Sequence, residues 1–153
     1  MEQLMNDLLR QIAEKMGNLV EVVDEDYGQL DALKNGEPAY PVTFPCVLVG
    51  VPETTWDSLS AGTQRGWLIL SVRLAFDCGV QLSAAGNTVS ERAAQRYQLV
   101  SRLNEAVQGW CFEGCQSAAA RTKSVQTAEQ GNIKVYELQY AVTVIERNQN
   151  SVS

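Results

Sequence analysis

Hydrophobic residues at the start of the chain recur at the spacing of an α-helix. One apolar stripe contains Leu4, Met5, Leu8, Leu9, Ile12 and Met16. Gly17 and Asn18 favour an end to this helix, and the β-branched residues 19–23 predict a short strand after it. The carboxylates at residues 24–26 could bind a cation only if ligands converged from several positions, so a solvated loop is the favoured interpretation.

Strict alternation of apolar and other residues predicts the clearest strand, residues 68–78. One face carries Leu68, Leu70, Val72, Leu74, Phe76 and Cys78, and we expect it to face the core. The other face carries Ile69, Ser71, Arg73, Ala75 and Asp77, a mixture that suits a wet surface or a contact with a neighbouring subunit.

The chain before this strand is rich in residues that interrupt regular structure. Residues 27–45 contain several prolines and glycines and predict irregular chain. Residues 46–51 predict a strand that ends at Pro52. Residues 52–66 are polar, with Trp56 and Leu59 embedded in them, and predict a loop.

A second helix and a hairpin are predicted in the remaining chain. Thr88 and Glu91 have the spacing of a capping box, and an apolar stripe from Ala93 to Trp110 follows at helical spacing. Residues 119–128 predict a polar edge strand, and residues 130–132 supply turn chemistry before a strand over 133–145. Ile133 and Val135 lie out of phase with the later apolar residues of this strand, which predicts a bulge near Val135.

These elements predict an α+β fold: an antiparallel or mixed sheet of about five strands packed against two helices, in the order α-β-β-β-α-β-β. The length of 153 residues fits a single domain over residues 1–147. Residues 148–153 are polar, lack periodicity and predict a frayed tail.

Composition narrows the classes of partner. The net charge of -6 is the wrong sign for a protein that gains affinity by neutralising phosphates, so we expect no specific nucleic-acid binding. The longest apolar runs are far below the ~20 residues of a membrane span. Charged residues interrupt the first helix, so it does not resemble a signal peptide, and we expect a cytosolic protein.

The sequence offers little catalytic or metal-binding chemistry. It contains no histidine, which removes the usual general base and the Ser/His/Asp and Cys/His arrangements, and it lacks the glycine-rich phosphate loops. In a reducing compartment Cys46, Cys78, Cys111 and Cys115 are expected to be free thiols. A zinc site built on Cys111 and Cys115 is disfavoured because histidine is absent, so we expect no metal, cofactor or catalytic residues.

The tryptophans have different interpretations. Trp110 completes the stripe of the second helix and is expected in the core, whereas Trp67 starts the long strand off its core face. Trp56 lies among polar residues and should either tuck under its loop or contact a partner protein; the sequence leaves both open.

The order of elements resembles the tail terminator and tail completion proteins of long-tailed phages. The likeness rests on the stripe over residues 4–16, the strands 46–51 and 68–78, the helix 91–109 and the hairpin 119–145, and on no short motif. Residues 27–45 and 109–116 depart from the pattern.

This resemblance implies a structural protein, without catalysis, that forms a ring, commonly a hexamer, and joins the tail tube to the head. Its partners would be other copies of itself and other tail or neck proteins, in the host cytoplasm during assembly and then in the virion. The candidates for subunit contacts are Trp56, Leu59, Trp67, Ile69, Ser71 and Arg73. The acidic balance suits a channel that passes DNA without retaining it.

Two other functions remain open from the sequence. One is a monomeric regulatory or small-ligand binding domain, which would contain a closed apolar cavity. The other is an enzyme that uses carboxylates, which would place Asp or Glu residues of raised pKa in a deep pocket.

Overall fold

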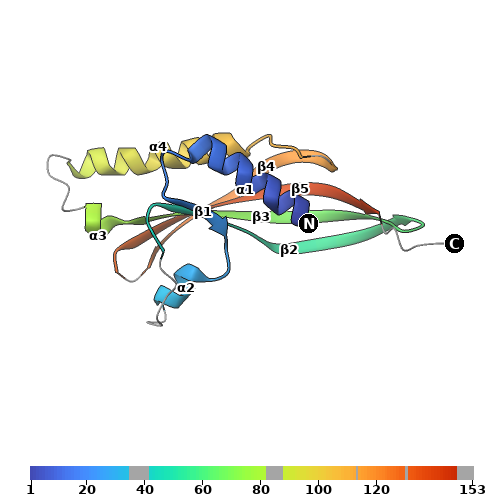
Figure 1. Ribbon diagram of the computed structural model, residues 1–153, viewed down its shortest axis with the longest axis horizontal. Coiled ribbons are helices and arrows are strands. Elements are labelled where there is room, and N and C mark those ends of the chain that lie inside the picture. The colour runs from blue at the N-terminus through green and yellow to red at the C-terminus, as the bar shows by residue number, and fades with distance from the viewer. Residues whose placement is uncertain (35–41, 82–87, 113, 130, 148–153) are drawn as a thin grey trace.

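A twisted sheet of long strands forms the centre of the molecule, with helices on both of its faces (Figure 1). The computed structural model describes residues 1–34, 42–81, 88–112, 114–129 and 131–147. The strands are β1 (Val22–Glu25), β2 (Cys46–Ser60), β3 (Thr63–Asp77), β4 (Cys115–Glu129) and β5 (Ile133–Arg147). The helices are α1 (Glu2–Met16), α2 (Gln29–Lys34), α3 (Cys78–Gln81) and α4 (Val89–Val107).

The sheet has five strands in the order β1-β2-β3-β5-β4. β1 pairs with β2 in parallel, and the other neighbours are antiparallel. The predicted α+β class and mixed sheet are therefore confirmed. The predicted order lacked the short helices α2 and α3. α2 lies in the segment predicted to be irregular, and α3 begins at Cys78, the last residue of the predicted strand over 68–78.

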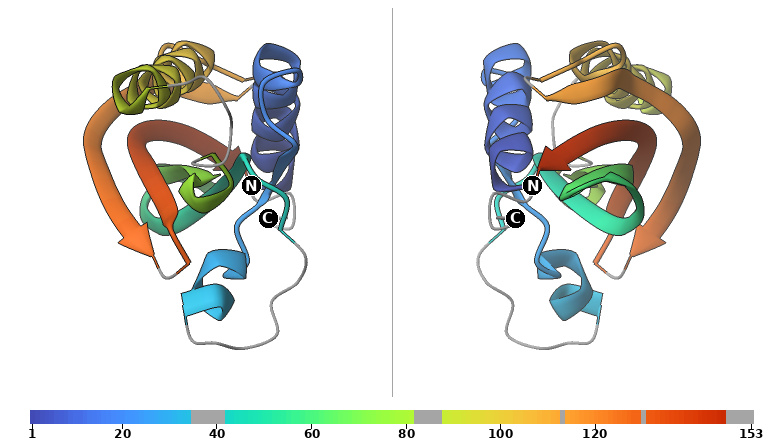
Figure 2. Two further views of the ribbon diagram at one scale, coloured as in Figure 1. Left: turned by 90° about the vertical axis from the view of Figure 1, so that its left-hand side faces the viewer. Right: turned by 90° about the vertical axis from the view of Figure 1, so that its right-hand side faces the viewer.

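The main core lies between one face of the sheet and the helices α1 and α4. These two helices lie side by side over that face (Figure 2). The predicted stripe of α1 is confirmed, because Leu4, Leu8, Ile12 and Met16 are at most 1% exposed. The predicted core face of β3 is confirmed as well, since its alternate residues from Leu68 to Phe76 are buried in the same cluster.

A second, smaller cluster lies on the opposite face of the sheet, beneath α2. Its buried members are Leu30, Cys46, Leu48, Ala75, Ile133 and Val135. The predicted bulge near Val135 is wrong, because β3 and β5 pair without a register shift from Thr63↔Arg147 to Asp77↔Ile133. Ile133 and Val135 face this second cluster, while Tyr136 faces the main core. The consecutive residues Val135 and Tyr136 are both apolar because both faces of the sheet are buried there.

The prediction of a loop over residues 52–66 is wrong. These residues form the distal half of a long β2–β3 hairpin, which extends past the ends of α1 and α4 (Figure 1). Pro52 does not end β2, because the register of the pairing shifts between Gly50 and Glu53, and a bulge tolerates the missing N–H. We call residues 53–69 the hairpin arm.

Two local predictions differ in detail. The first strand covers Val22–Glu25 rather than residues 19–23, so two of the carboxylates expected in a loop lie in β1. β2 and β1 pair in parallel over Cys46–Val49 and Val22–Glu25, which extends the strand into the acidic residues. The predicted capping box of α4 is confirmed, with Thr88 Oγ1 accepting from Glu91 N at 3.1 Å and Glu91 Oε2 accepting from Thr88 N at 3.2 Å.

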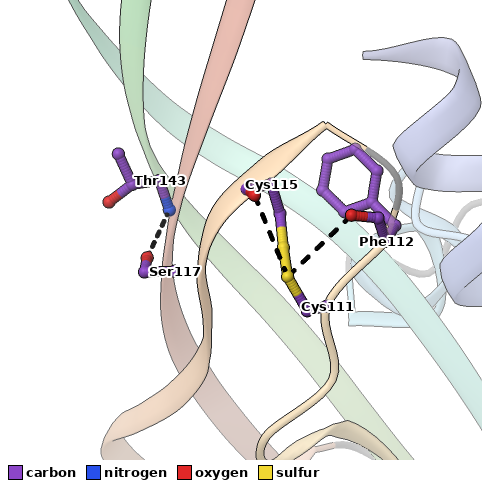
Figure 3. The surroundings of a disulfide bond; sticks show 5 residues. All are labelled: Cys111, Phe112, Cys115, Ser117 and Thr143. Atoms are coloured by element: carbon purple, nitrogen blue, oxygen red, sulfur yellow. Dashed lines mark hydrogen bonds between the residues drawn. A yellow bond between two sulfur atoms is a disulfide. The ribbon is translucent and has the colours of Figure 1, made fainter.

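The expectation that all four cysteines are free thiols is wrong for one pair. Cys111 and Cys115 form a disulfide in the turn between α4 and β4 (Figure 3), whereas Cys46 and Cys78 are free. Trp110 follows the end of α4 rather than completing it, and it packs half-buried against the main core. Its position in the core was therefore predicted correctly, but from the wrong element.

Candidate subunit interface

The hairpin arm presents a half-exposed tryptophan on the sheet face opposite the main core. Trp67 is 46% exposed, and its Nε1 donates a hydrogen bond to Asp57 Oδ2 at 2.9 Å. The guanidinium of Arg65 lies 4.9 Å from the Trp67 ring centroid, and its Nη2 is 3.7 Å from Asp57 Oδ2. These contacts fix the indole before any partner binds, which lowers the entropy lost on binding.

Two other candidate residues lie on the same arm. Leu59 is 46% exposed close to the tip of the hairpin. Ile69 is half-buried, pairs with Glu53 across the hairpin and shares the face of Trp67. The arm therefore combines a held tryptophan, a residue type enriched at energetically important positions of interfaces, with two apolar residues.

Trp56 belongs to the other face of the arm. It pairs with Gly66, and a Cβ atom built on Gly66 would lie 2.7 Å from Cζ3 of the Trp56 ring. The ring therefore covers the glycine backbone, and Trp56 packs half-buried against the main core. Of the two interpretations left open for Trp56, the structure shows the tucked one.

Ser71 and Arg73 lie nearer the centre of the sheet and have internal partners. Ser71 Oγ donates to Glu137 Oε2 at 2.6 Å, and Arg73 Nε donates to Asp26 Oδ2 at 2.8 Å. The side chains of Arg73 and Asp26 are each 18% exposed. Ser71 and Arg73 line a hollow of about 410 Å³ together with Glu25, Asp26, Gly28, Asp31, Gly50, Val51, Pro52 and Glu137.

The outer edge of the arm was missed by the sequence analysis. β1 pairs with β2 over Cys46–Val49, and no described strand pairs with the outer edge of β2 beyond that segment. Such an edge presents unpaired backbone groups to a partner. The sequence of residues 53–60 carries no apolar alternation that would have indicated this edge, because only Thr54 and Trp56 are half-buried there and the other residues are exposed.

Two buried groups have perturbed protonation equilibria. Burial raises the pKa of the Cys46 thiol from 9.0 to about 11. Burial also raises the pKa of the Tyr140 hydroxyl, which donates to Asn104 Oδ1 at 2.7 Å. Both groups therefore keep their protons to a higher pH than they would in water.

The described part of the chain lacks the features of a metal site and of a membrane-spanning helix. It places no group of three or more His, Cys, Asp or Glu residues where they could hold a metal ion. None of its helices combines the length and apolar character needed to cross a membrane.

Comparison with known proteins adds one finding. No protein-family model matches the sequence, and no curated protein matches it either. Among solved structures, the fold matches a chain of the virion of a native gene transfer agent particle, with a TM-score of 0.57 and 14% sequence identity. The match covers 91% of this chain and 92% of that chain.

This chain shares its fold with that virion chain. At such low identity the match describes the architecture and does not transfer the role of individual residues.

Proposed function

We propose that this protein is a structural component of a phage-like virion, and specifically a tail-terminator-like subunit whose ring joins the tail tube to the head without catalysis. The observation that carries the proposal is the fold match to a virion chain over nearly the full length of both chains. The order of elements in the sequence supports the narrower role, because it resembles tail terminator and tail completion proteins.

The hairpin arm supplies a contact of the kind that a ring requires. A closed ring joins one surface of each subunit to a different surface of the next. The tip of the arm lies beyond the ends of α1 and α4 (Figure 1). β5 pairs with the β3 side of the arm as far as Thr63↔Arg147, and Leu59 and Trp67 remain 46% exposed. We assign the primary contact to Leu59, Trp67 and Ile69.

The remaining candidates take supporting places in this proposal. Trp56 stiffens the arm from its core face, through its contact with Gly66. Ser71 and Arg73 lie at the base of the arm beside the acidic hollow, where a neighbouring subunit reaches them only after the arm has docked.

The mass of the purified protein over a wide concentration range tests the proposal, by light scattering or sedimentation velocity. We expect a discrete species of the size of a hexamer. The double variant Leu59→Lys and Trp67→Lys should remove this species, because two desolvated charges would lie in the contact. The new lysine at position 67 would lie beside both Asp57 and Arg65, so its attraction to the carboxylate offsets its repulsion from the guanidinium.

Val89→Lys is the matched control. Val89 is 73% exposed at the start of α4, away from the arm, and this variant should assemble like the parent protein. A parent protein that stays monomeric at every concentration would contradict the ring. Equal assembly of the double variant and the parent would contradict the assignment of the contact to the arm.

A further inference from the structure

The turn between α4 and β4 brings two cysteines together through its backbone (Figure 3). Trp110 N donates to Val107 O at 2.9 Å, and Cys115 N donates to Phe112 O at 3.1 Å. The Cα atoms of Cys111 and Cys115 are 5.9 Å apart, inside the range that a disulfide spans without backbone movement. Since hydrogen bonds already shape the turn, it can hold the two sulfurs together in either redox state.

The reduced form of the turn also has suitable partners. Cys111 Sγ lies 3.9 Å from Phe112 O and 4.0 Å from Cys115 O, so a thiol at this position has carbonyl acceptors within reach. A weak S–H donor is satisfied by such contacts. Neither the disulfide nor the dithiol therefore leaves a polar group without a partner at Cys111.

Access to the sulfur atoms differs among the four cysteines. Cys111 is exposed and Cys115 is half-buried, so a small thiol or disulfide reaches the Cys111 sulfur from solvent. Cys46 is completely buried, and its raised pKa keeps it in the unreactive thiol form. Cys78 is half-buried at the start of α3, with no described cysteine bonded to it.

We propose that Cys111 and Cys115 are a reversible thiol–disulfide exchange site for small thiols and disulfides of the glutathione class. In oxidation, the Cys111 thiolate attacks a small disulfide, forms a mixed disulfide and releases one small thiolate. The Cys115 thiolate then attacks the Cys111 sulfur, closes the protein disulfide and releases the second small thiolate. One small disulfide is reduced to two thiols for each pair that is oxidised, and reduction follows the same steps in reverse.

Formation of the Cys111–Cys115 disulfide links the packed turn to the start of β4. The rings of Trp110 and Phe112 stack with their centroids 5.3 Å apart, and both pack against the main core. Ala119 N donates to Trp110 O at 2.8 Å, which links the same turn to β4. Oxidation therefore stabilises the junction of α4, β4 and the core, and this holds whether or not the protein forms a ring.

Alkylation of the folded protein after equilibration in glutathione buffers tests the proposal. Trypsin releases residues 103–121 as one peptide that contains Cys111 and Cys115 and neither of the other cysteines. We expect this peptide to carry two alkyl groups after equilibration with reduced glutathione and none after equilibration with oxidised glutathione. Returning the oxidised protein to reduced glutathione should restore both alkyl groups. The oxidised protein should melt about 4–8 °C higher than the reduced protein, because the bond constrains the unfolded chain.

Two variants make the result specific. Cys111→Ser should remove the dependence of the melting temperature on redox buffer, whereas Cys78→Ser should keep it. The proposal is overturned if both thiols remain alkylated after excess oxidised glutathione, or if the bond resists millimolar reduced glutathione. Equal melting temperatures of the two redox forms would also overturn it.

Discussion

Trp56 and Trp67 lie on opposite faces of one hairpin, and their surroundings give them different roles. Trp56 covers the backbone of Gly66 and joins the main core. Trp67 is half-exposed and is held by Asp57 and Arg65. Their neighbours across the hairpin, Gly66 for Trp56 and Asp57 with Arg65 for Trp67, decide which tryptophan is available to a partner.

The contact between Trp56 and Gly66 predicts a sharp response to a single methyl group. Gly66→Ala would place a Cβ atom 2.7 Å from the Trp56 ring, closer than real Cβ contacts allow. We expect the free energy of unfolding to fall by about 1–3 kcal/mol, the usual cost of overpacking. Urea unfolding measures it.

Gly50→Ala is the control for this substitution. A Cβ atom there would lie 3.6 Å from Cβ of Asp26, an ordinary contact, so the stability should change much less. Equal effects at Gly50 and Gly66 would show that the loss of glycine, and not the displaced indole, determines the result.

At the scale of elements, α4 is anchored unevenly. Its buried residues are Leu103, Ala106 and Val107, all in its C-terminal part, while residues 88–91 at its start are exposed. Packing therefore holds the end of α4, and the capping box holds its beginning. A helix that lacks both would leave backbone N–H groups of its first turn without partners.

Thr88→Ala should lower the free energy of unfolding by about 1 kcal/mol, because the acceptor for Glu91 N is removed. Hydrogen exchange should show faster exchange in the first turn of α4 and unchanged exchange around Leu103. Thr88→Ser keeps the hydroxyl and should behave like the parent. Equal destabilisation by serine and alanine would point to the lost methyl group instead of the cap.

At the scale of the whole molecule, the sheet is covered on both faces at one end and projects as the hairpin arm at the other. Cys46 lies in the second cluster and Tyr140 in the main core, so each face buries a weakly acidic group whose pKa is shifted. Burial raises the pKa of both groups, and the folded protein therefore holds their protons more tightly than the unfolded chain does.

Stability should consequently decline in alkaline solution. The contribution of Cys46 is complete below pH 9.0 and is lost as the pH rises towards about 11, because the unfolded thiol ionises first. Urea unfolding between pH 7 and pH 10.5 measures this slope. Cys46→Ala should make the decline shallower than in the parent protein, because the buried thiol is removed; an unchanged slope would refute the assignment to Cys46.

Sequence reasoning was most accurate where one face of an element is buried and the other is wet. The α1 stripe, the alternation of β3 and the Thr88–Glu91 cap were all predicted from local spacing and are present in the structure. It was least accurate where that condition fails. Ile133 and Val135 suggested a bulge because the sheet is buried on both faces there. The arm resembled a loop because its β2 half is polar and mostly exposed.

Among the candidate contact residues, some are left exposed by the structure and others already have partners within the chain. Leu59 was identified from the sequence as an apolar residue in a polar stretch and Trp67 as the start of the long strand off its core face, and the structure leaves both about half exposed. Ser71 and Arg73 were chosen from the same mixed strand face, but Glu137 and Asp26 provide their partners from distant parts of the chain. No periodicity within β3 could have indicated those contacts.

The sequence by itself determined the positions of the main helices, the core face of the long strand and the capped start of α4, because each depends on residues within a few positions of one another. The tertiary structure decided which tryptophan is buried, which strand residues already have partners and how far the hairpin projects. It also brought Cys111 and Cys115 together within the turn. These properties depend on the residues that lie across the sheet and across the turn, and the spacing of residues along the chain does not indicate those neighbours.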